Sequence, residues 1–387
     1  MNRRAPAAIA IVLAVVGSVG LFLAQTRTGE AMPPFAQALK VDCSNCHTSV
    51  PALNAFGRFV QRTGYGALDP ATIHSAMPVW IGESAFFDTS DPNKPHQLQT
   101  GNLAVHAIGY LGNAVTFHYQ QWITQNDKPG GIDTLWLSYD RLFHGDGHLF
   151  VGKIEPPAPS PYSQWFELAG FASPSITVGQ HNWELGANRW GTKLQYSHEW
   201  LEADAGYLGS SNDLSGAGDF SSDQEKTFQW RTAWAVQDKP LEYGFYGSSG
   251  VAPISVNIVD QYHSTAIYAE LDPVNDKPGL FTTYQRGFDS HPNIIAGTAS
   301  STAFSIDAFE PAFHDRVMLG VRHEYTDDGL GTATTGNDFD VEWEARKSVT
   351  TSNVSGLLVN AELATGESAR PVYRYQIWYV TTIGPLR

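Results

Sequence analysis

From about Leu98 to Ile383 the sequence alternates between apolar and polar residues with a period of two. In the clearest run, 227–236, Phe228 and Trp230 fall on one face of an extended chain and Arg231 falls on the other. About sixteen such runs follow one another, and most are about ten residues long, which is the length that a tilted strand needs to cross a bilayer. The pattern predicts a mainly β chain in which residues 98–387 form a transmembrane antiparallel β-barrel of about 16 strands.

Clusters of turn-forming residues separate these runs. Short and long connections tend to alternate, as expected when one rim of a barrel faces the periplasm and the other faces the medium. The alternation of short and long connections breaks between Glu155 and Asn188, and we interpret this segment as a long loop. The expected turns are HGDG at 144–147, DKP at 238–240, LDPVNDKPG at 271–279 and GTATTGND at 331–338.

A soluble β-sandwich or a β-propeller would also have alternating strands. The runs are long for a sandwich, and no repeat of blade length is visible. The composition, with 36 glycines and only 16% charged residues, fits a sheet rich in tight turns better than a helical enzyme. Aromatic residues also collect near the expected strand ends, where membrane barrels have interfacial girdles: Trp122, Tyr139, Tyr246, Tyr325, Trp378 and Tyr379.

The only two cysteines of the chain lie in the pentapeptide CSNCH, as Cys43 and Cys46, with His47 directly behind them. C-x-x-C-H is the covalent attachment signature of a c-type haem. Two thiols three positions apart on one helical turn reach the two vinyl groups of one porphyrin, and the next imidazole becomes an axial ligand of the iron. The motif predicts one covalent haem c, with thioether links from both cysteines and His47 as the proximal ligand.

Three other interpretations of this motif are a disulfide, a redox C-x-x-C and half of a zinc site. A zinc site needs two more ligands, and the chain has no further cysteine to supply them. A thioredoxin-like motif belongs in a βαβ setting, which this sequence lacks. Haem attachment is therefore favoured.

Residues 32–80 are predicted to form a small α-helical cytochrome domain around this haem. Pro51 can open a helix and Gly64 can end it. Apolar residues between them recur at helical spacing and offer one face to a porphyrin, or form the ordinary core of a small domain: Leu53, Phe56, Phe59 and Val60.

The second axial ligand of the haem iron is sought in ATIHSAMPVW, residues 71–80. His74 and Met77 are its two candidates, because histidine and methionine both serve as distal ligands in electron-transfer cytochromes. Met77 is the favoured ligand and His74 is the alternative. A ligand elsewhere in the chain, or none, remains open.

Residues 1–31 resemble a secretory signal peptide. Arg3 and Arg4 precede an apolar run from Ala5 to Ala24, and small residues follow at Gly29 and Ala31. An uncleaved membrane anchor is the alternative, because the run is just long enough to span a bilayer. The formal net charge of −15 argues against a nucleic-acid partner and suits cations or basic electron-transfer proteins.

The motif CSNCH is followed by Pro51, by Leu53-Asn54-x-Phe56-Gly57 and by Gly64-Tyr65, and then by the long alternating region. This arrangement resembles the outer-membrane monohaem cytochrome-porin fusions of iron-oxidising bacteria. The resemblance implies a location in the outer membrane of a Gram-negative cell, with the cytochrome domain at or in the porin. It also implies that Cys43, Cys46 and His47 carry a haem that takes electrons from extracellular Fe(II), or another donor, and passes them to a periplasmic c-type cytochrome or a similar carrier.

A physical argument points the same way, because hydrocarbon about 30 Å thick separates the two compartments and one exposed haem does not bridge it. A haem domain inside a wide barrel would place iron part-way across, and one-electron transfer needs no general acid, base or nucleophile. The chain is thus predicted to be an electron-transfer cytochrome, and the resemblance implies that it oxidises Fe(II). Two other interpretations stay open: a solute channel with a haem plug, and a soluble periplasmic cytochrome subunit of a dehydrogenase.

The first two strands of the predicted barrel carry a pair of histidines. A three-residue loop, 111–113, places His106 directly opposite His118 on the lumen side. Two neutral imidazoles at this spacing can hold a passing transition-metal ion or approach the haem. The alternative is that they are two polar side chains in a wet lumen.

Overall fold

The structure is a computed structural model of the 387-residue chain. The predicted signal segment 1–31 and the predicted haem residues Cys43, His74 and Met77 lie outside the part that it describes. It describes residues 39, 41, 45–49, 52–68, 79–89, 98–125, 128–157, 159, 174, 176–179, 181–183, 186, 188–209, 226–236, 239–255, 257–273, 277–293, 297–313, 317–349, 354–365 and 371–383.

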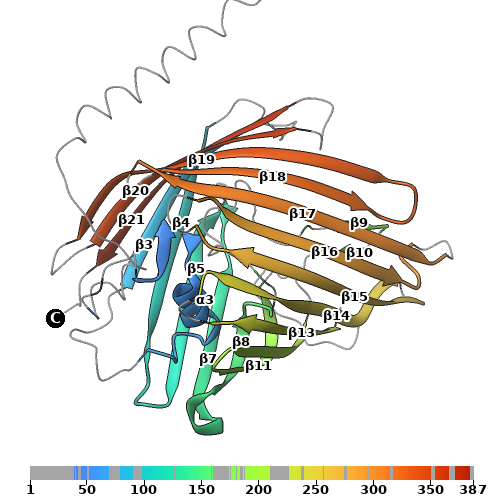
Figure 1. Ribbon diagram of the computed structural model, residues 1–387, viewed down its shortest axis with the longest axis horizontal. Helices are drawn as coiled ribbons and strands as arrows, with labels where there is room; N and C mark the ends of the chain where they lie inside the picture. The colour runs from blue at the N-terminus through green and yellow to red at the C-terminus, as the bar shows by residue number, and fades with distance from the viewer. Residues whose placement is uncertain are drawn as a thin grey trace, which may run out of the picture.

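Sixteen antiparallel strands form a closed barrel, in which β21 pairs with β3 to complete the ring (Figure 1). The predicted barrel and its strand number are therefore confirmed. A two-residue strand, β6 (Lys128–Pro129), adds to the end of β5. The sixteen strands are β3 (Val79–Asp88), β4 (Leu98–Tyr110), β5 (Val115–Gln125), β7 (Ile132–Leu142), β8 (Gly147–Ile154), β11 (Arg189–His198), β12 (Leu201–Leu208), β13 (Lys226–Ala235), β14 (Leu241–Ser255), β15 (Ile258–Leu271), β16 (Gly279–Asp289), β17 (Ala299–Ala312), β18 (Val317–Asp327), β19 (Ala333–Val349), β20 (Val354–Thr365) and β21 (Val372–Ile383).

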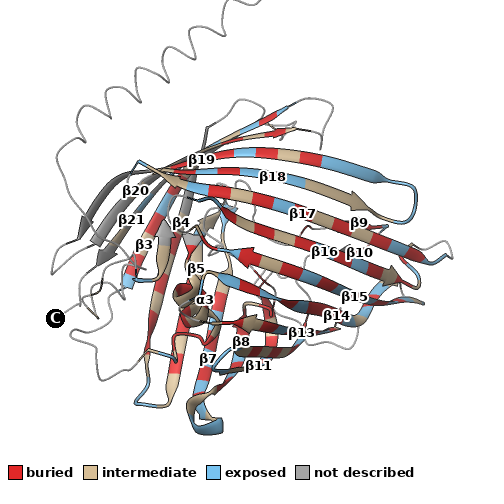
Figure 2. Cartoon of the chain, in the orientation of Figure 1, coloured by how far each residue is buried: buried red, intermediate tan, exposed pale blue. Residues whose placement is uncertain are grey.

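The barrel is polar inside and apolar outside. In β13, Arg231 is only 1% exposed, whereas the apolar Phe228, three positions earlier and on the opposite face, is 47% exposed. Figure 2 shows the same alternation of buried and exposed residues along most strands. Because outward-facing side chains of a membrane barrel meet lipid and inward-facing ones meet the lumen, this surface is that of a transmembrane barrel. No helix in the described part of the chain has the length and apolar character needed to cross a membrane.

Three predictions, on the start of the barrel, a girdle residue and a turn, differ from the structure. The barrel begins at Val79 and not at Leu98, because β3 turns the bulky Trp80 inward and the charged Glu83 outward, which hides its alternation. Tyr246 is no girdle residue, since it lies in the middle of β14 and is buried toward the lumen.

The third difference is the turn expected at 331–338. Strand β19 already begins at Ala333, and the turn is 328–332. The carboxylate of Asp328 accepts the backbone N–H groups of Leu330 (2.7 Å) and Thr332 (2.9 Å), which closes the turn early. Thr334 and Thr335, which follow the turn, favour a β-strand because they are β-branched.

The two ends of the barrel differ in their connections. One end carries the two longest connections, 155–188 and 209–225, and we call it the long-loop rim. The other end, the short-turn rim, carries connections such as 111–114, 143–146 and 199–200, together with the start of β3 and the end of β21. In bacterial barrels the short turns face the periplasm. The long loop predicted between Glu155 and Asn188 is confirmed, and it contains a small hairpin of β9 (Ile176–Val178) and β10 (His181–Trp183).

Leu137→Arg tests the membrane assignment. Leu137 is central in β7 and 51% exposed on the outer face. An arginine at the midplane of a bilayer costs a membrane barrel about 2–4 kcal/mol of folding free energy. We expect that loss in denaturant unfolding of the vesicle-reconstituted protein, followed by tryptophan fluorescence. The control is Leu241→Arg at the start of β14, where the cost near the interface is about 0–1 kcal/mol; equal effects of the two changes would contradict the assignment.

Candidate functional site

One short helix, α3 (Ala55–Arg62), lies inside the ring of strands, where Val60 joins Trp136 of β7 and Phe150 of β8 in one buried cluster (Figure 1). The side chain of Asn54 caps its N-terminus by accepting the N–H of Gly57 at 2.9 Å. At its C-terminus Gly64, with φ of 60°, donates to Gln61 O (2.9 Å) while Tyr65 N–H donates to Val60 O (2.8 Å). These two bonds form a Schellman motif, so the predicted end at Gly64 is confirmed. The helix begins at Ala55, later than Pro51 suggested.

The second half of CSNCH packs against this helix. The carbonyl of Cys46 accepts the N–H of Asn54 at 3.0 Å, and a Cβ at Gly57 would lie 1.9 Å from the same carbonyl oxygen. Only glycine permits this approach of the helix to the motif. His47 does not continue a helical turn: it begins β1 (His47–Ser49), which pairs with β2 (Ala52–Leu53). Of the described residues of this motif, Asn45 has 3-10 helical conformation and Cys46 lies in a turn, so the helical setting does not extend to His47.

The Cys46 thiol lies in a largely buried setting. Burial raises the pKa of this thiol to about 11, because the thiolate would lose its hydration. A redox-active cysteine needs the opposite shift, toward a lower pKa. The surroundings of Cys46 therefore argue against a redox C-x-x-C and leave a neutral thiol.

Arg58 fastens the helix to the barrel wall. Its guanidinium lies 2.8 Å from Glu270, 2.6 Å from Asp272 and 3.5 Å from Glu242, and it is 1% exposed. Burial alone would lower the pKa of Arg58, but these carboxylates raise it well above its usual range. The same wall reaches the helix N-terminus, where Asp272 accepts the N–H of Ala55 at 3.0 Å.

Arg62, one turn further along, extends this network. It forms a bidentate pair with Glu242 at 2.6 and 2.7 Å, and it lies 3.0 Å from Glu202. Arg231 of the wall binds both of these glutamates and also Asp204, at 2.8 Å. We call residues 45–49 and 52–68 the plug, because these buried ion pairs hold them within the barrel.

The residues after the helix pack against an apolar and aromatic stretch of the wall. Tyr65 stacks on Trp136 at a ring distance of 6.4 Å and meets His118 edge-on at 6.1 Å. Burial raises the pKa of Tyr65 well above its usual range, with further contributions from the nearby Glu155 and Cys46. The cluster therefore lies beside the motif. Its members are Val60, Tyr65, Ile108, Trp136, Phe150, Ile154 and Leu208.

The structure brings His106 and His118 together, but not as predicted. Ile108, not His106, is the direct partner of His118, because the hairpin loop is shifted by one residue, to 112–114. Gly112, with φ of 72°, makes this turn possible. Both imidazoles still face the lumen and are buried, since the shift in pairing is two residues, and their ring centroids are 6.1 Å apart.

The plug and the wall beside it offer donors and surroundings that a haem requires. A neutral thiol and an imidazole adjoin at Cys46 and His47, and an apolar, aromatic surface lies beside them. In the described part of the chain, Nε2 of the buried His118 has no hydrogen-bond partner, while its Nδ1 lies 3.3 Å from Thr134 Oγ1. The donor chemistry and the surroundings fit a covalently held haem, which would supply one-electron chemistry at its iron.

The role of Arg58 and Arg62 as anchors of the helix was not predicted from the sequence. Arg58 and Arg62 lie four positions apart, on one face of a short and otherwise largely apolar helix. That pair was the available signal, because two charges on a helix buried inside the protein need partners. Their partners on β12, β14 and β15 were not recognisable, since they come from strands far away in the sequence.

No protein-family model matches the sequence, and a search of curated proteins finds no match either. Solved structures do match. The loop L8 deletion mutant of OmpT, an outer membrane protein of Vibrio cholerae, superimposes with a TM-score of 0.53 at 12% identity, over 78% of this chain and 97% of that one. The anion-selective porin from Comamonas acidovorans gives 0.52 at 12% identity, over 79% and 98%.

The fold is that of a porin. At such low identity the likeness concerns the fold alone, and it supports the interpretation as a porin-like barrel more directly than the interpretation as an electron conduit. Together with the apolar outer surface, it confirms the predicted location in the outer membrane of a Gram-negative cell. A soluble periplasmic subunit does not fit this surface. The cytochrome part of the predicted resemblance stays a prediction.

Arg58→Met tests the anchoring of the plug. It leaves Glu270 and Asp272 buried without their cation, and breaking a buried pair in this way costs about 3–5 kcal/mol. We expect the plug to leave the wall and the single-channel conductance in planar bilayers to rise. Gln61→Met, on the same helix but outside the ion pairs, is the control and should conduct like the native protein. A native-like conductance of Arg58→Met would contradict the anchoring role.

Proposed function

We propose that this barrel transfers electrons across the outer membrane through one covalently bound haem c, held by Cys43, Cys46 and His47. The donor is extracellular Fe(II), or another donor, and the acceptor is a periplasmic c-type cytochrome or a similar carrier. The observation that carries the proposal is the position of CSNCH: this haem-attachment signature adjoins a helix that buried ion pairs fix inside the barrel.

The position of the plug along the barrel supports this direction of transfer. Glu202 and Glu242 are each the second residue of their strands, and Glu270 is the last but one of β15. All three lie at the short-turn rim. A haem on the plug would thus be near the periplasm, where a soluble carrier can approach it.

The charge of the lumen supports a cationic donor. Among the described residues, 13 buried side chains are acidic and only 6 are basic, and most of them face the lumen. An acidic channel raises the local concentration of cations and therefore favours Fe(II) over anionic solutes. The Comamonas porin, described as anion-selective, would differ from this chain in that respect.

The residues of the chain have simple tasks in this proposal. His47 would act as the proximal ligand, and Met77 or His74 as the distal one. Tyr65, Trp136 and their apolar neighbours would exclude water from the porphyrin edge, while His106 and His118 line the wall nearby. No acid, base or nucleophile is required, because only electrons move.

A cation-conducting channel is the second candidate function, and the porin-like fold favours it directly. In that case the plug would narrow the lumen, and any haem would be structural. The two functions differ in a measurable way, because a channel conducts ions whether or not a haem is attached, whereas the electron conduit requires the haem.

The deciding experiment uses the full chain in vesicles that enclose a redox dye or a soluble cytochrome c. Fe(II) added outside should reduce the enclosed acceptor in native vesicles. Cys43→Ala/Cys46→Ala should remove both the haem stain of a denaturing gel and this reduction, because both thioether links are lost. Haem staining that persists in the double variant would contradict the attachment, and equal rates of reduction would contradict the electron-transfer function. Ser44→Ala, between the two cysteines, is the control.

The distal ligand is tested separately by visible spectroscopy and redox titration. Met77→Ala should abolish the methionine-to-iron charge-transfer band and lower the reduction potential, since a methionine ligand raises it. His74→Ala should leave both unchanged. The reverse result would assign His74 as the ligand, and no effect of either change would place the ligand elsewhere.

A further inference from the structure

A second group of ligating side chains lies in the lumen, away from the plug. The hairpin of β9 and β10 folds inward from the connection 155–188 and lies beside β16 and β17 (Figure 1). Its tight turn at Gly179 fits closely against the wall, where a Cβ would come within 2.4 Å of Pro292 O. This placement brings His181 of the hairpin to Asp260 of β15 and Asp289 of β16.

The three side chains form a compact set of donors. Nδ1 of His181 lies 2.6 Å from Asp289 Oδ1 and 3.5 Å from Asp260 Oδ2, and one donor atom from each residue lies within 4.8 Å of the others. Metal–ligand bonds of about 2.1 Å at right angles put neighbouring donors about 3 Å apart. The set therefore has the size of one face of a metal coordination shell. Within the described residues it is the one group of three or more such side chains with this spacing.

The orientation of Asp260 is an independent indication of a ligand site. Its Oδ1 accepts the backbone N–H of His291 at 2.8 Å and the hydroxyl of Ser290 at 3.1 Å. Its Oδ2 is turned toward His181 and, among the described residues, has no hydrogen-bond partner, although Asp260 is 0% exposed. The hydrogen bonds to Oδ1 thus fix the orientation of the Asp260 carboxylate, and its Oδ2 points into the space between the three side chains.

Charge also requires a cation or a proton here. Two carboxylates that share a buried site repel each other unless something positive lies between them. Imidazole and carboxylate oxygens together suit Mn(II), Fe(II) and Zn(II), and the ring of Tyr262, 4.2 Å from the imidazole, holds the histidine in place.

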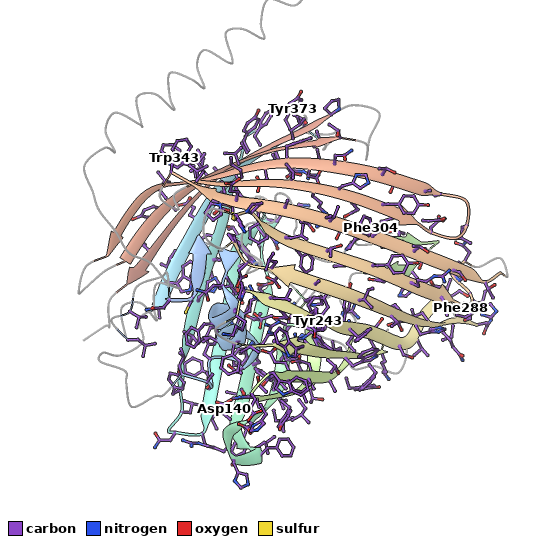
Figure 3. The ribbon with its side chains drawn as sticks, viewed as in Figure 1. Asp140, Tyr243, Phe288, Phe304, Trp343 and Tyr373 are labelled. Atoms are coloured by element: carbon purple, nitrogen blue, oxygen red, sulfur yellow. The ribbon has the colours of Figure 1, made fainter. Side chains whose placement is uncertain are left out.

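We propose that His181, Asp260 and Asp289 form a binding site for a divalent transition-metal ion. The site lies at the long-loop rim, because Asp260 is the third residue of β15 and Asp289 is the last of β16. Figure 3 shows the neighbouring Phe288 at this end of the molecule and Asp140, on β7, far from it near the opposite rim. An ion from the medium reaches this site before the plug, so if the proposed function holds, it is where Fe(II) first binds. Along β15, Asp260 and Glu270 are about 33 Å apart at about 3.3 Å per residue, which makes this a capture site and not the direct electron donor.

The competing interpretation is that hydrogen bonds alone attach the hairpin to the barrel wall, without a metal ion. Nδ1–H of His181 donating to Asp289 would by itself tie the hairpin to the wall. In that case a proton on Asp289, hydrogen-bonded to Asp260, would relieve the repulsion of the two carboxylates, and no ion would bind. The two interpretations differ in their response to Asp260→Asn, which keeps the Oδ1 hydrogen bonds and removes the charge of the carboxylate.

The test is a titration of the purified full chain with Mn(II), followed by electron paramagnetic resonance of the free ion. We expect one site of higher affinity, weakened at least about tenfold in Asp260→Asn and in His181→Ala, and displaced by Zn(II). Asp340→Asn is the matched control, since Asp340 is also a buried acidic residue of the lumen but lies on β19, outside the group. It should bind like the native protein.

Two results would overturn the proposal. If the native chain binds no Mn(II), the three side chains only attach the hairpin to the wall by hydrogen bonds. If Asp340→Asn weakens binding as much as Asp260→Asn does, the ions collect along the acidic lumen without a defined site. Haem staining of the same samples separates this question from the proposed function: a chain without haem that still binds Mn(II) contradicts the haem and leaves the metal site standing.

Discussion

Every backbone N–H and C=O group within a bilayer must find a partner inside the protein, because hydrocarbon offers none. For a chain of strands, closure of the sheet into a ring is the solution, and here β21 meets β3 to complete it. Closure divides each strand into a lipid face and a lumen face. The inner surface is then free to carry charge, and both candidate sites of this protein are built on that surface.

The charged lumen in turn determines what a plug must look like. Carboxylates on β12, β14 and β15 would be costly to bury alone, and Arg58 and Arg62 of a short helix neutralise them. The helix in turn presses Gly57 against the carbonyl of Cys46, so half of the haem-attachment motif is positioned by the same ion pairs. Thus one network of ion pairs links the barrel wall to the proposed redox centre. The hairpin with His181 meets the wall in the same manner, again with carboxylates as its counterpart.

Much of the fold was predictable. A period of two is a local property of each strand, and it indicated the barrel, the number of strands and the lumen side of His106 and His118. It did not predict the exact pairing of these histidines, because the parity of a register survives a shift of two residues while the partner does not. Strand β3 was missed since Trp80 faces inward, where other strands carry polar residues. The turn at Gly64 was recognisable because glycine is the usual residue at the left-handed position that ends a helix.

The sequence by itself determined the barrel class and the end of the helix behind CSNCH, and it is the source of the proposed haem chemistry of that motif, because each depends on neighbours within a few residues. Only the tertiary structure decided where these parts lie. Arg58 finds Glu270 and Asp272 more than two hundred positions away, and His181 finds Asp289 across 108 positions. Such partners are set by the closure of the ring and by the inward fold of a long connection. The sequence pattern of a single strand carries no information about either, since it repeats alike around the whole barrel.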